Sequence, residues 1–223
     1  MLRIYHIEAR RSDRVVWLME ELGLDYELIF TPKDIAASLM AIKAVHPIGA
    51  APTVRDGDLW LCESGAILEY VVNRHGGGRF GVKPDAPGYP QYLQWMHFAE
   101  GSAMGRIINE MMIAPMLAAS GAPKPPIAGL FAGNSRRLLD FFEQSLAGQD
   151  YFAGEDFSAA DIMMLMPVRA ARRACQGEVR PNVEAWCARV EARPAYARML
   201  ARALPNGPPP TLAGWPKEDA QPV

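Results

Sequence analysis

The sequence predicts a two-domain protein, with an α/β domain at the N-terminus followed by an all-helical domain. Strand-like and helix-like segments alternate up to residue 80, whereas the apolar spacing further along the chain is helical throughout. A stretch rich in glycine and proline, GGGRFGVKPDAPGYP, separates the two patterns. We therefore expect domains at 1–80 and 89–204, a linker at 81–88 and a proline-rich C-terminal tail at 205–223.

Composition argues against several classes of protein. The chain has 223 residues, half of them hydrophobic, and a net charge of -2, which gives no electrostatic case for nucleic acid or an anionic membrane. No apolar run approaches the roughly 20 residues that span a bilayer, and the N-terminus lacks the apolar region of a signal peptide. The three cysteines are widely spaced, so we expect no disulfide framework, no metal site and a cytoplasmic location.

The first domain is expected to follow the order β-α-β-α-β-β-α. Ser12 can cap the first helix and Gly23 can end it. Asp56 and Gly57 lie between two apolar runs, which is a strong hairpin signal. A helix joins the first two strands, so they should pair in parallel through a right-handed crossover. The expected segments are strands at 2–7 and 26–30, helices at 13–22 and 34–45, hairpin strands at 53–54 and 59–62, and a helix at 64–75.

The second domain contains one helix start with a clear signature, FSAADIMMLM. Ser158 is the expected N-cap and Asp161, three residues later, completes a capping box. Phe157 and Ile162 occupy the positions of a hydrophobic staple. The remaining helices are expected at about 89–118, 127–147, 181–192 and 194–203.

Glu63 and Ser64 stand side by side at the expected start of a helix. Free N–H groups and the positive end of the helix dipole suit a carboxylate there, and Ser64 adds a hydroxyl donor. Glu63 adds a charge for an ammonium group, so the pair matches an α-amino-acid group. The simpler interpretation is that Ser64 only caps the helix and Glu63 is a solvated acid.

The strand upstream of this pair must be an edge strand or begin at Pro52, because proline cannot donate to a strand ladder. If the Ala51–Pro52 bond is cis, the backbone of Ala51 would offer a docking edge to a peptide-like ligand. The alternative is an ordinary trans proline at a strand start.

Five stretches, in this order, resemble the soluble glutathione transferase family, in the branch common among bacterial and fungal enzymes. The first stretch resembles the family's first helix and second strand. The second resembles its glutathione-site segment, which contains the cis-proline. The other three resemble the start, the capping-box helix and the last helices of its second domain. The stretches are RSDRVVWLMEELGLDYEL, HPIGAAPTVRDGDLWLCESGAILEYVVNR, YLQWMHFAEGSAM, YFAGEDFSAADIMM and PNVEAWCARVEARPAY.

The resemblance implies a thioredoxin-like N-terminal domain, an all-helical second domain and a homodimer. It implies an enzyme of detoxification that has no permanently bound cofactor, takes glutathione as co-substrate and conjugates its thiolate to hydrophobic electrophiles. Glutathione would lie along Ala51 and Pro52, with Glu63 and Ser64 holding its γ-glutamyl group.

The chain departs from the family pattern where the thiolate is stabilised. The thiolate is the nucleophile, and a hydrogen-bond donor or positive charge lowers the thiol pKa. The branch often has a serine where this chain has Arg10. Three replacements stay open: the charge of Arg10 or Arg11, the hydroxyl of Ser12, or the hydroxyl of Tyr5. Arg11, with Arg14, can alternatively brace the helix and the domain interface.

A second departure is Ala50, where the family often has a lysine. The glycyl carboxylate of glutathione is then left to Lys43, His46 or Lys33.

Further residues complete the predicted site. The resemblance implies that Glu100 reaches the partner's glutathione site. Met104 and Met111, in a group with Met112 and Met116, could form a wall for hydrophobic substrates, although core packing is the favoured interpretation. Alternative functions are a glutathione-dependent peroxidase or isomerase, or a non-enzymatic glutathione- or ligand-binding regulatory protein on the same fold.

Overall fold

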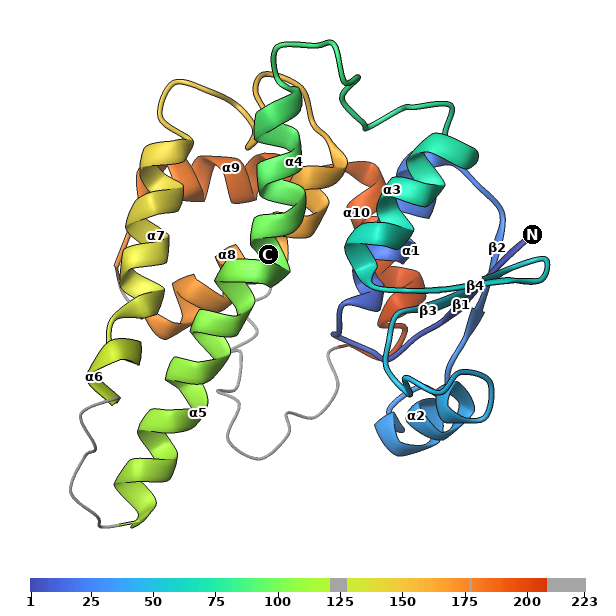
Figure 1. Ribbon diagram of the computed structural model, residues 1–223, viewed down its shortest axis with the longest axis horizontal. Helices are drawn as coiled ribbons and strands as arrows, with labels where there is room; N and C mark the ends of the chain where they lie inside the picture. The colour runs from blue at the N-terminus through green and yellow to red at the C-terminus, as the bar shows by residue number, and fades with distance from the viewer. Residues whose placement is uncertain (121–127, 177, 208–223) are drawn as a thin grey trace.

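The computed structural model describes residues 1–120, 128–176 and 178–207. It contains the predicted α/β domain and the predicted helical domain, lying side by side (Figure 1). The predicted fold class is therefore confirmed.

The N-terminal domain is built on a four-stranded mixed sheet in the order β2-β1-β3-β4. β1 pairs in parallel with β2 and antiparallel with β3, which pairs antiparallel with β4. The parallel pair and the hairpin were both expected. The elements are β1 Leu2–Tyr5, α1 Ser12–Leu22, β2 Tyr26–Ile29, α2 Ile35–Lys43, β3 Thr53–Asp56, β4 Leu59–Cys62 and α3 Ser64–Arg74.

The two faces of the sheet belong to different cores, because successive side chains of a strand point to opposite sides. Leu2 and Ile4 of β1 pack with α1 and α3 in the main core, which continues into the helical domain. Tyr5 points the other way and packs with Ile42 of α2 in a small second core. Helices α1 and α3 therefore lie between the sheet and the second domain.

Two local predictions are shifted by one residue. Asp56 pairs with Leu59 across the hairpin, so the turn is made by Gly57 and Asp58 instead of Asp56 and Gly57. Gly57 has φ +58°, which glycine adopts without steric cost. Ser12 is the first residue of α1 and Arg11 occupies the N-cap position, so Ser12 is not the cap.

The helical domain begins with one continuous helical run. α4 passes into a π-helical segment, η1, and then into α5, where a single helix was expected. The predicted second helix is divided, since α6 and α7 are separated around Gly133 at φ +71°. The elements are α4 Tyr89–Phe98, η1 Ala99–Met104, α5 Gly105–Ser120, α6 Ala128–Phe131, α7 Asn134–Ser145, α8 Ala159–Ala174, α9 Pro181–Glu191 and α10 Pro194–Ala203.

Two sequence-based expectations concern segments that the structure does not describe. The break after residue 118 was expected over a stretch that includes 121–127, and most of the proline-rich tail falls within 208–223; both ranges lie outside the described residues.

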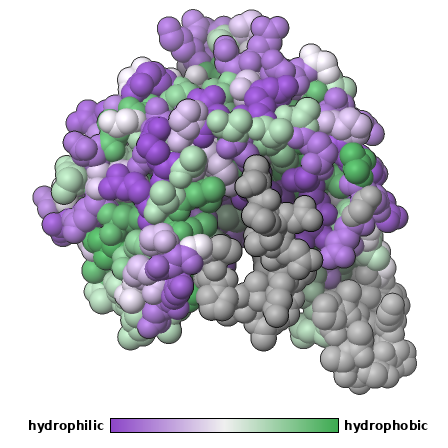
Figure 2. Space-filling model, turned by 180° about the vertical axis from the view of Figure 1, so that it is seen from behind, coloured by the Kyte–Doolittle hydropathy of each residue, from purple (hydrophilic) through white to green (hydrophobic). Residues whose placement is uncertain are grey.

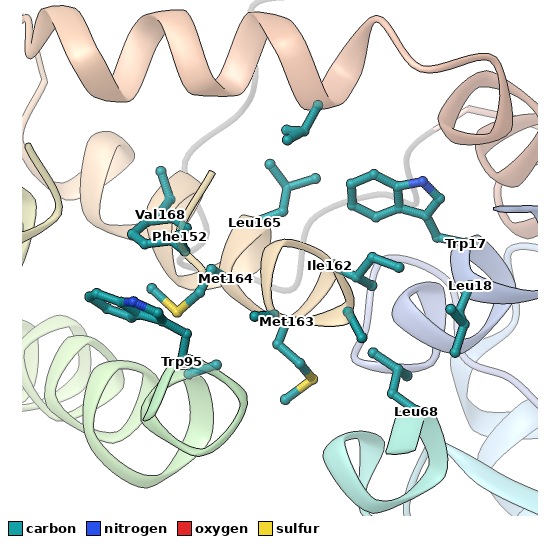
Figure 3. Close-up of a cluster of buried hydrophobic side chains, with 14 of the residues drawn as sticks. Trp17, Leu18, Leu68, Trp95, Phe152, Ile162, Met163, Met164, Leu165 and Val168 are labelled. Carbon is teal, nitrogen blue, oxygen red and sulfur yellow. The ribbon is translucent and has the colours of Figure 1, made fainter. Parts of the chain in front are cut away.

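The predicted capping box starts α8, the central helix of the molecule. The Asp161 carboxylate accepts hydrogen bonds from the Ser158 backbone N–H at 2.9 Å and from Phe152 N–H at 3.0 Å. It also accepts one from the Trp186 indole at 2.9 Å, and all of these groups are buried. Side chains of α8 such as Ile162, Met163 and Met164 then pack between Trp95 on one side and Leu18 and Leu68 on the other (Figure 3).

The domains share an extensive polar boundary as well as a core. α10 lies along α1, with Arg193 donating to Glu21 at 2.6 and 2.8 Å and Arg198 donating to Glu20 at 2.9 Å (Figure 1). The carbonyl of Phe80, just before the linker, accepts the first N–H of α8, from Ala159, at 2.7 Å. Within the described residues, no helix is long and apolar enough to cross a membrane.

Candidate functional site

The backbone before β3 presents an edge to solvent. The Ala51–Pro52 bond is cis. Among the described residues, no hydrogen bond uses the N–H or C=O of Ala51, whereas the C=O of Ala50 accepts the Thr53 hydroxyl at 2.8 Å. Ala51 therefore offers one free donor and one free acceptor, the pair that an extended peptide backbone would need.

Glu63 and Ser64 occupy the start of α3, as expected, but in different surroundings. Glu63 is the N-cap residue, exposed, without a side-chain capping bond and with φ +70°. Ser64, the first helical residue, is buried. A non-glycine residue at positive φ is held there at a cost of about 1–3 kcal/mol, and such residues cluster at ligand-binding positions.

A buried arginine lies directly behind Ser64. Arg14 of α1 donates to Ser64 Oγ at 3.1 Å, to Glu100 Oε1 at 2.5 Å and to the carbonyl of Met163 at 2.8 Å. Glu100 accepts a further hydrogen bond from Arg11 Nε at 2.7 Å. Burial lowers the pKa of Arg14, and the Glu100 carboxylate acts in the opposite direction.

These contacts bear on the roles expected for Glu100 and Arg14. Both carboxylate oxygens of Glu100 bind arginines of its own chain, and one of these arginines also contacts Ser64. A contact of Glu100 with a partner's glutathione site stays a prediction. The expectation that Arg14 braces the domain interface is confirmed, since it joins α1 to η1 and α8.

Ser12 is fully buried and its hydroxyl is used inside the domain. Ser12 Oγ lies 2.8 Å from His6 Nδ1 and 3.1 Å from the Ile7 carbonyl, and it accepts the Ile7 N–H at 3.2 Å. His6 Nε2 lies 2.9 Å from the Ala203 carbonyl in α10. Burial lowers the pKa of His6 to about 4, so the neutral ring donates to Ala203 and accepts from Ser12. Ser12 is thus a structural link between the domains.

The other two thiolate candidates differ in access. Tyr5 is buried in the small core, with its ring 5.6 Å from that of Trp60. Arg10 is half-buried in the turn after β1, and its guanidinium donates to the Ala9 carbonyl at 3.0 Å. Arg11, the remaining candidate, is partly exposed and its Nε donates to Glu100 at 2.7 Å.

The residues proposed for the glycyl carboxylate lie around α2. Lys43 is exposed, and its stem passes so close to Gly49 that a Cβ on that glycine would stand 2.9 Å from Lys43 Cγ. His46 is half-buried, with Nδ1 accepting the Ile48 N–H at 3.3 Å. Lys33 is exposed at φ +62°, and its N–H donates to the buried Glu8 carboxylate at 2.6 Å. All three thus stand on the side of the sheet that carries α2.

The methionine wall is only partly where it was expected. Met104 is buried in the core, which corrects its placement in a substrate site, and Met111 is half-buried against the same core. Met112 and Met116 of α5 are exposed instead.

Seen from behind, hydrophobic residues gather at the lower left over the region of α2, where Met40 and other apolar side chains are exposed (Figure 2).

Two groups of contacts were not anticipated from the sequence. The link from His6 to Ala203 joins residues at opposite ends of the chain, and no local pattern announces it. Arg14 was noted only as an interface brace. Arg14 lies in the first turn of α1, directly before the apolar run VVWLM. That position was a signal that a buried cation needed a nearby acceptor.

The fold and the site together define a class: a thioredoxin-like domain with a helical domain, carrying a free backbone edge beside a serine at a helix start. Two family models match the chain. The one described as "Glutathione S-transferase, N-terminal domain" covers residues 4–79, and the one described as "Glutathione S-transferase, C-terminal domain" covers residues 132–194.

Curated relatives agree with both models. "Glutathione S-transferase 3" of Schizosaccharomyces pombe is 32% identical over 206 residues, covering 87% of this chain and 85% of the relative. "Glutathione S-transferase 3" of Zea mays is 29% identical over 211 residues, covering 89% of this chain and 91% of the relative. The chain belongs to the glutathione S-transferase family, as the resemblance implied, and the expected function of a glutathione transferase is confirmed at that level.

Solved structures share the fold. A glutathione S-transferase from Actinobacillus pleuropneumoniae superposes with a TM-score of 0.80 at 24% identity, covering 93% of this chain and 94% of that chain. A glutathione transferase from Phanerochaete chrysosporium in complex with oxidized glutathione gives a TM-score of 0.72 at 24% identity, covering 91% and 96%.

Proposed function

We propose that this protein binds glutathione across Ala51 and the start of α3 and transfers its thiolate to hydrophobic electrophilic molecules. The observation that carries the proposal is the combination of a free donor and acceptor at Ala51 with Ser64 at the α3 N-terminus. A peptide backbone would pair with Ala51, while its γ-glutamyl carboxylate would meet Ser64 and the dipole of α3.

Glu63 and Arg10 complete the proposed glutathione site. The exposed carboxylate of Glu63 would bind the γ-glutamyl ammonium group. Arg10 would stabilise the thiolate by charge, because Ser12 is fully buried and already hydrogen-bonded and Arg11 is paired with Glu100. Lys43 and His46 are the proposed partners of the glycyl carboxylate. A fungal structure of the same fold is a complex with oxidized glutathione, which supports glutathione as the ligand.

The second substrate is proposed to bind against the helical domain near Met111, where polarizable thioethers adapt to varied apolar shapes. Catalysis would then consist of thiolate stabilisation and proximity of the two reactants.

We also propose a cytoplasmic homodimer.

The test is a calorimetric titration of glutathione into the wild-type protein and a Glu63→Ala/Ser64→Ala double variant. Charged hydrogen bonds contribute about 1.5–3 kcal/mol each, so we expect the double variant to bind at least about 100-fold more weakly. Turnover of an activated aryl halide should fall with it.

Two results would contradict the proposal. Wild-type protein that fails to bind glutathione at millimolar concentration would remove the site altogether. Undiminished binding by the double variant would place glutathione elsewhere. Binding without turnover of any electrophile would favour the non-enzymatic alternative.

A further inference from the structure

Glu8 is a buried acidic residue that the proposed mechanism does not use. It lies three residues beyond the end of β1 and is 2% exposed. Its Oε2 accepts the backbone N–H of Lys33 at 2.6 Å, while its Oε1 is buried and has no hydrogen-bond partner in the part of the chain that the structure describes. A buried carboxylate with one unpaired oxygen is costly to the fold. The bond to Lys33 therefore calls for a reason other than stability.

The bond from Glu8 holds a strained turn between β2 and α2. The Asp34 N–H donates to the Thr31 carbonyl at 3.1 Å, and the Thr31 N–H donates to Ser38 Oγ of α2 at 2.9 Å. Pro32 and Lys33 are the two central residues, and Lys33 has φ +62°. This is the pattern of a type II turn, in which the position of Lys33 favours glycine. A lysine kept there at a steric cost marks a candidate functional position.

The sheet places this turn at the same edge as the rest of the proposed glutathione site. β1 and β2 run parallel, and β3 runs antiparallel to β1 and to β4. The segments after β1, β2 and β4 and the segment before β3 therefore meet at one edge. Along the strand order β2-β1-β3-β4, this edge carries Lys33, Arg10, Ala51 and Ser64. A ligand that runs from Ser64 past Ala51 is directed toward the Lys33 turn.

Lys33 can supply a positive charge to the far end of such a ligand. It is exposed, and within the described residues its ammonium group forms no ion pair or hydrogen bond. Neighbouring strands lie about 4.8 Å apart, so two strand spacings, about 10 Å, separate the Lys33 turn from Ala51. One glycyl residue spans about 3.5 Å, and the four-carbon stem of the lysine covers the remaining distance.

We propose that Glu8 is a positioning residue that sets the preference for glutathione: it holds the Lys33 turn so that the Lys33 ammonium group meets the C-terminal carboxylate of the bound tripeptide. The inference rests on the proposed function, since it needs the tripeptide to lie along Ala51, and it adds Lys33 to Lys43 and His46. Glu8 itself does not touch the ligand. A carboxylate that only stabilised the fold would affect all ligands of the site alike.

The test compares glutathione with γ-glutamylcysteine, which lacks the glycyl residue. Calorimetry gives the dissociation constants of both ligands for the wild type, Glu8→Met, Glu8→Gln and Lys33→Gly. Glu8→Met removes the acceptor while filling its space, Glu8→Gln keeps an acceptor oxygen, and Lys33→Gly keeps the turn without the ammonium group.

We expect the preference for glutathione over γ-glutamylcysteine to fall about fivefold in Glu8→Met and in Lys33→Gly, which is the effect of one exposed ion pair. Glu8→Gln should keep the wild-type preference. The combined variant Glu8→Met/Lys33→Gly should fall no further than either single variant, because both act through the same ammonium group.

Lys83→Gly is the matched control, because Lys83 is also exposed but lies in the linker. It removes the same charge, and it should leave the preference for glutathione unchanged.

The outcomes separate this inference from the proposed function. Equal weakening of both ligands in Glu8→Met, or equal binding of both by the wild type, would overturn the positioning role and leave the proposed function in place. An unchanged preference in Lys33→Gly would overturn it as well, and this variant decides the question should Glu8→Met not fold. Absence of binding of either ligand by the wild type would overturn the proposed function itself.

Discussion

Arg10 and Ser12 illustrate how two neighbouring residues with similar predicted roles take different ones in the folded chain. Ser12 is fully buried between His6 and Ile7, while Arg10 is half-buried in the adjoining turn. If Arg10 stabilises the thiolate, Arg10→Ala should raise the apparent pKa of bound glutathione by about one unit. The turnover rate near neutral pH should then fall up to tenfold. The measurement is the pH profile of kcat/KM with an activated aryl halide, and Arg10→Lys should restore most of the loss.

Ser12→Ala is the complementary variant, because it tests whether Ser12 has a structural role instead of a role at the thiolate. It leaves the buried Ile7 N–H without its acceptor, so we expect a loss of about 1–3 kcal/mol in the free energy of unfolding. The midpoint of the pH profile should not move. A shifted profile in Ser12→Ala with an unchanged one in Arg10→Ala would reverse the two assignments.

Among the elements, α8 has a first turn that is tied to distant parts of its domain through Asp161. Asp161 accepts from two backbone N–H groups and the Trp186 indole while buried. Asp161→Ala should therefore cost about 3–5 kcal/mol in the free energy of unfolding, because several buried donors lose their acceptor at once. Denaturant unfolding followed by far-UV circular dichroism measures this loss.

Ser158→Ala measures how much the N-cap hydroxyl alone contributes to the free energy of unfolding. It removes the N-cap hydroxyl and keeps the carboxylate, so a loss of about 1 kcal/mol is expected. Equal losses in the two variants would mean that Asp161 acts only as a cap and that its bonds to Phe152 and Trp186 contribute nothing.

In the whole molecule, the two domains are expected to unfold as one unit. Arg193 donates two hydrogen bonds to Glu21, whose side chain is 6% exposed, and its guanidinium lies 3.8 Å from the centre of the Phe157 ring. Arg193→Met leaves a nearly buried carboxylate unpaired, so we expect a loss of about 2–4 kcal/mol. Tryptophan fluorescence and circular dichroism should report the same shifted transition.

Arg136→Met is the control for that prediction. Arg136 pairs with Glu178 on the surface and is 65% exposed, so its removal should change stability by no more than about 0.5 kcal/mol. Two separate transitions in Arg193→Met would show that the domains are coupled mainly through this pair and not through their shared core.

By itself the sequence determined the order of strands and helices, the hairpin and the α8 capping box. These features depend on interactions within a few residues. Ser158 and Asp161 recognise each other across one helical turn, and Gly57 acts within its own turn. The resemblance to glutathione transferases implied the cis bond at Pro52 and a glutathione-binding role for the pair at the start of α3.

Only the tertiary structure decided which of those residues can meet a ligand. It buried Ser12 and Met104, and it placed Arg14 against Ser64, which is 50 residues away along the chain. It also turned both oxygens of Glu100 toward arginines of its own chain. The physical reason is that burial and the pairing of distant charges depend on how whole elements pack. A local pattern records the periodicity of one element but not the partner that covers it.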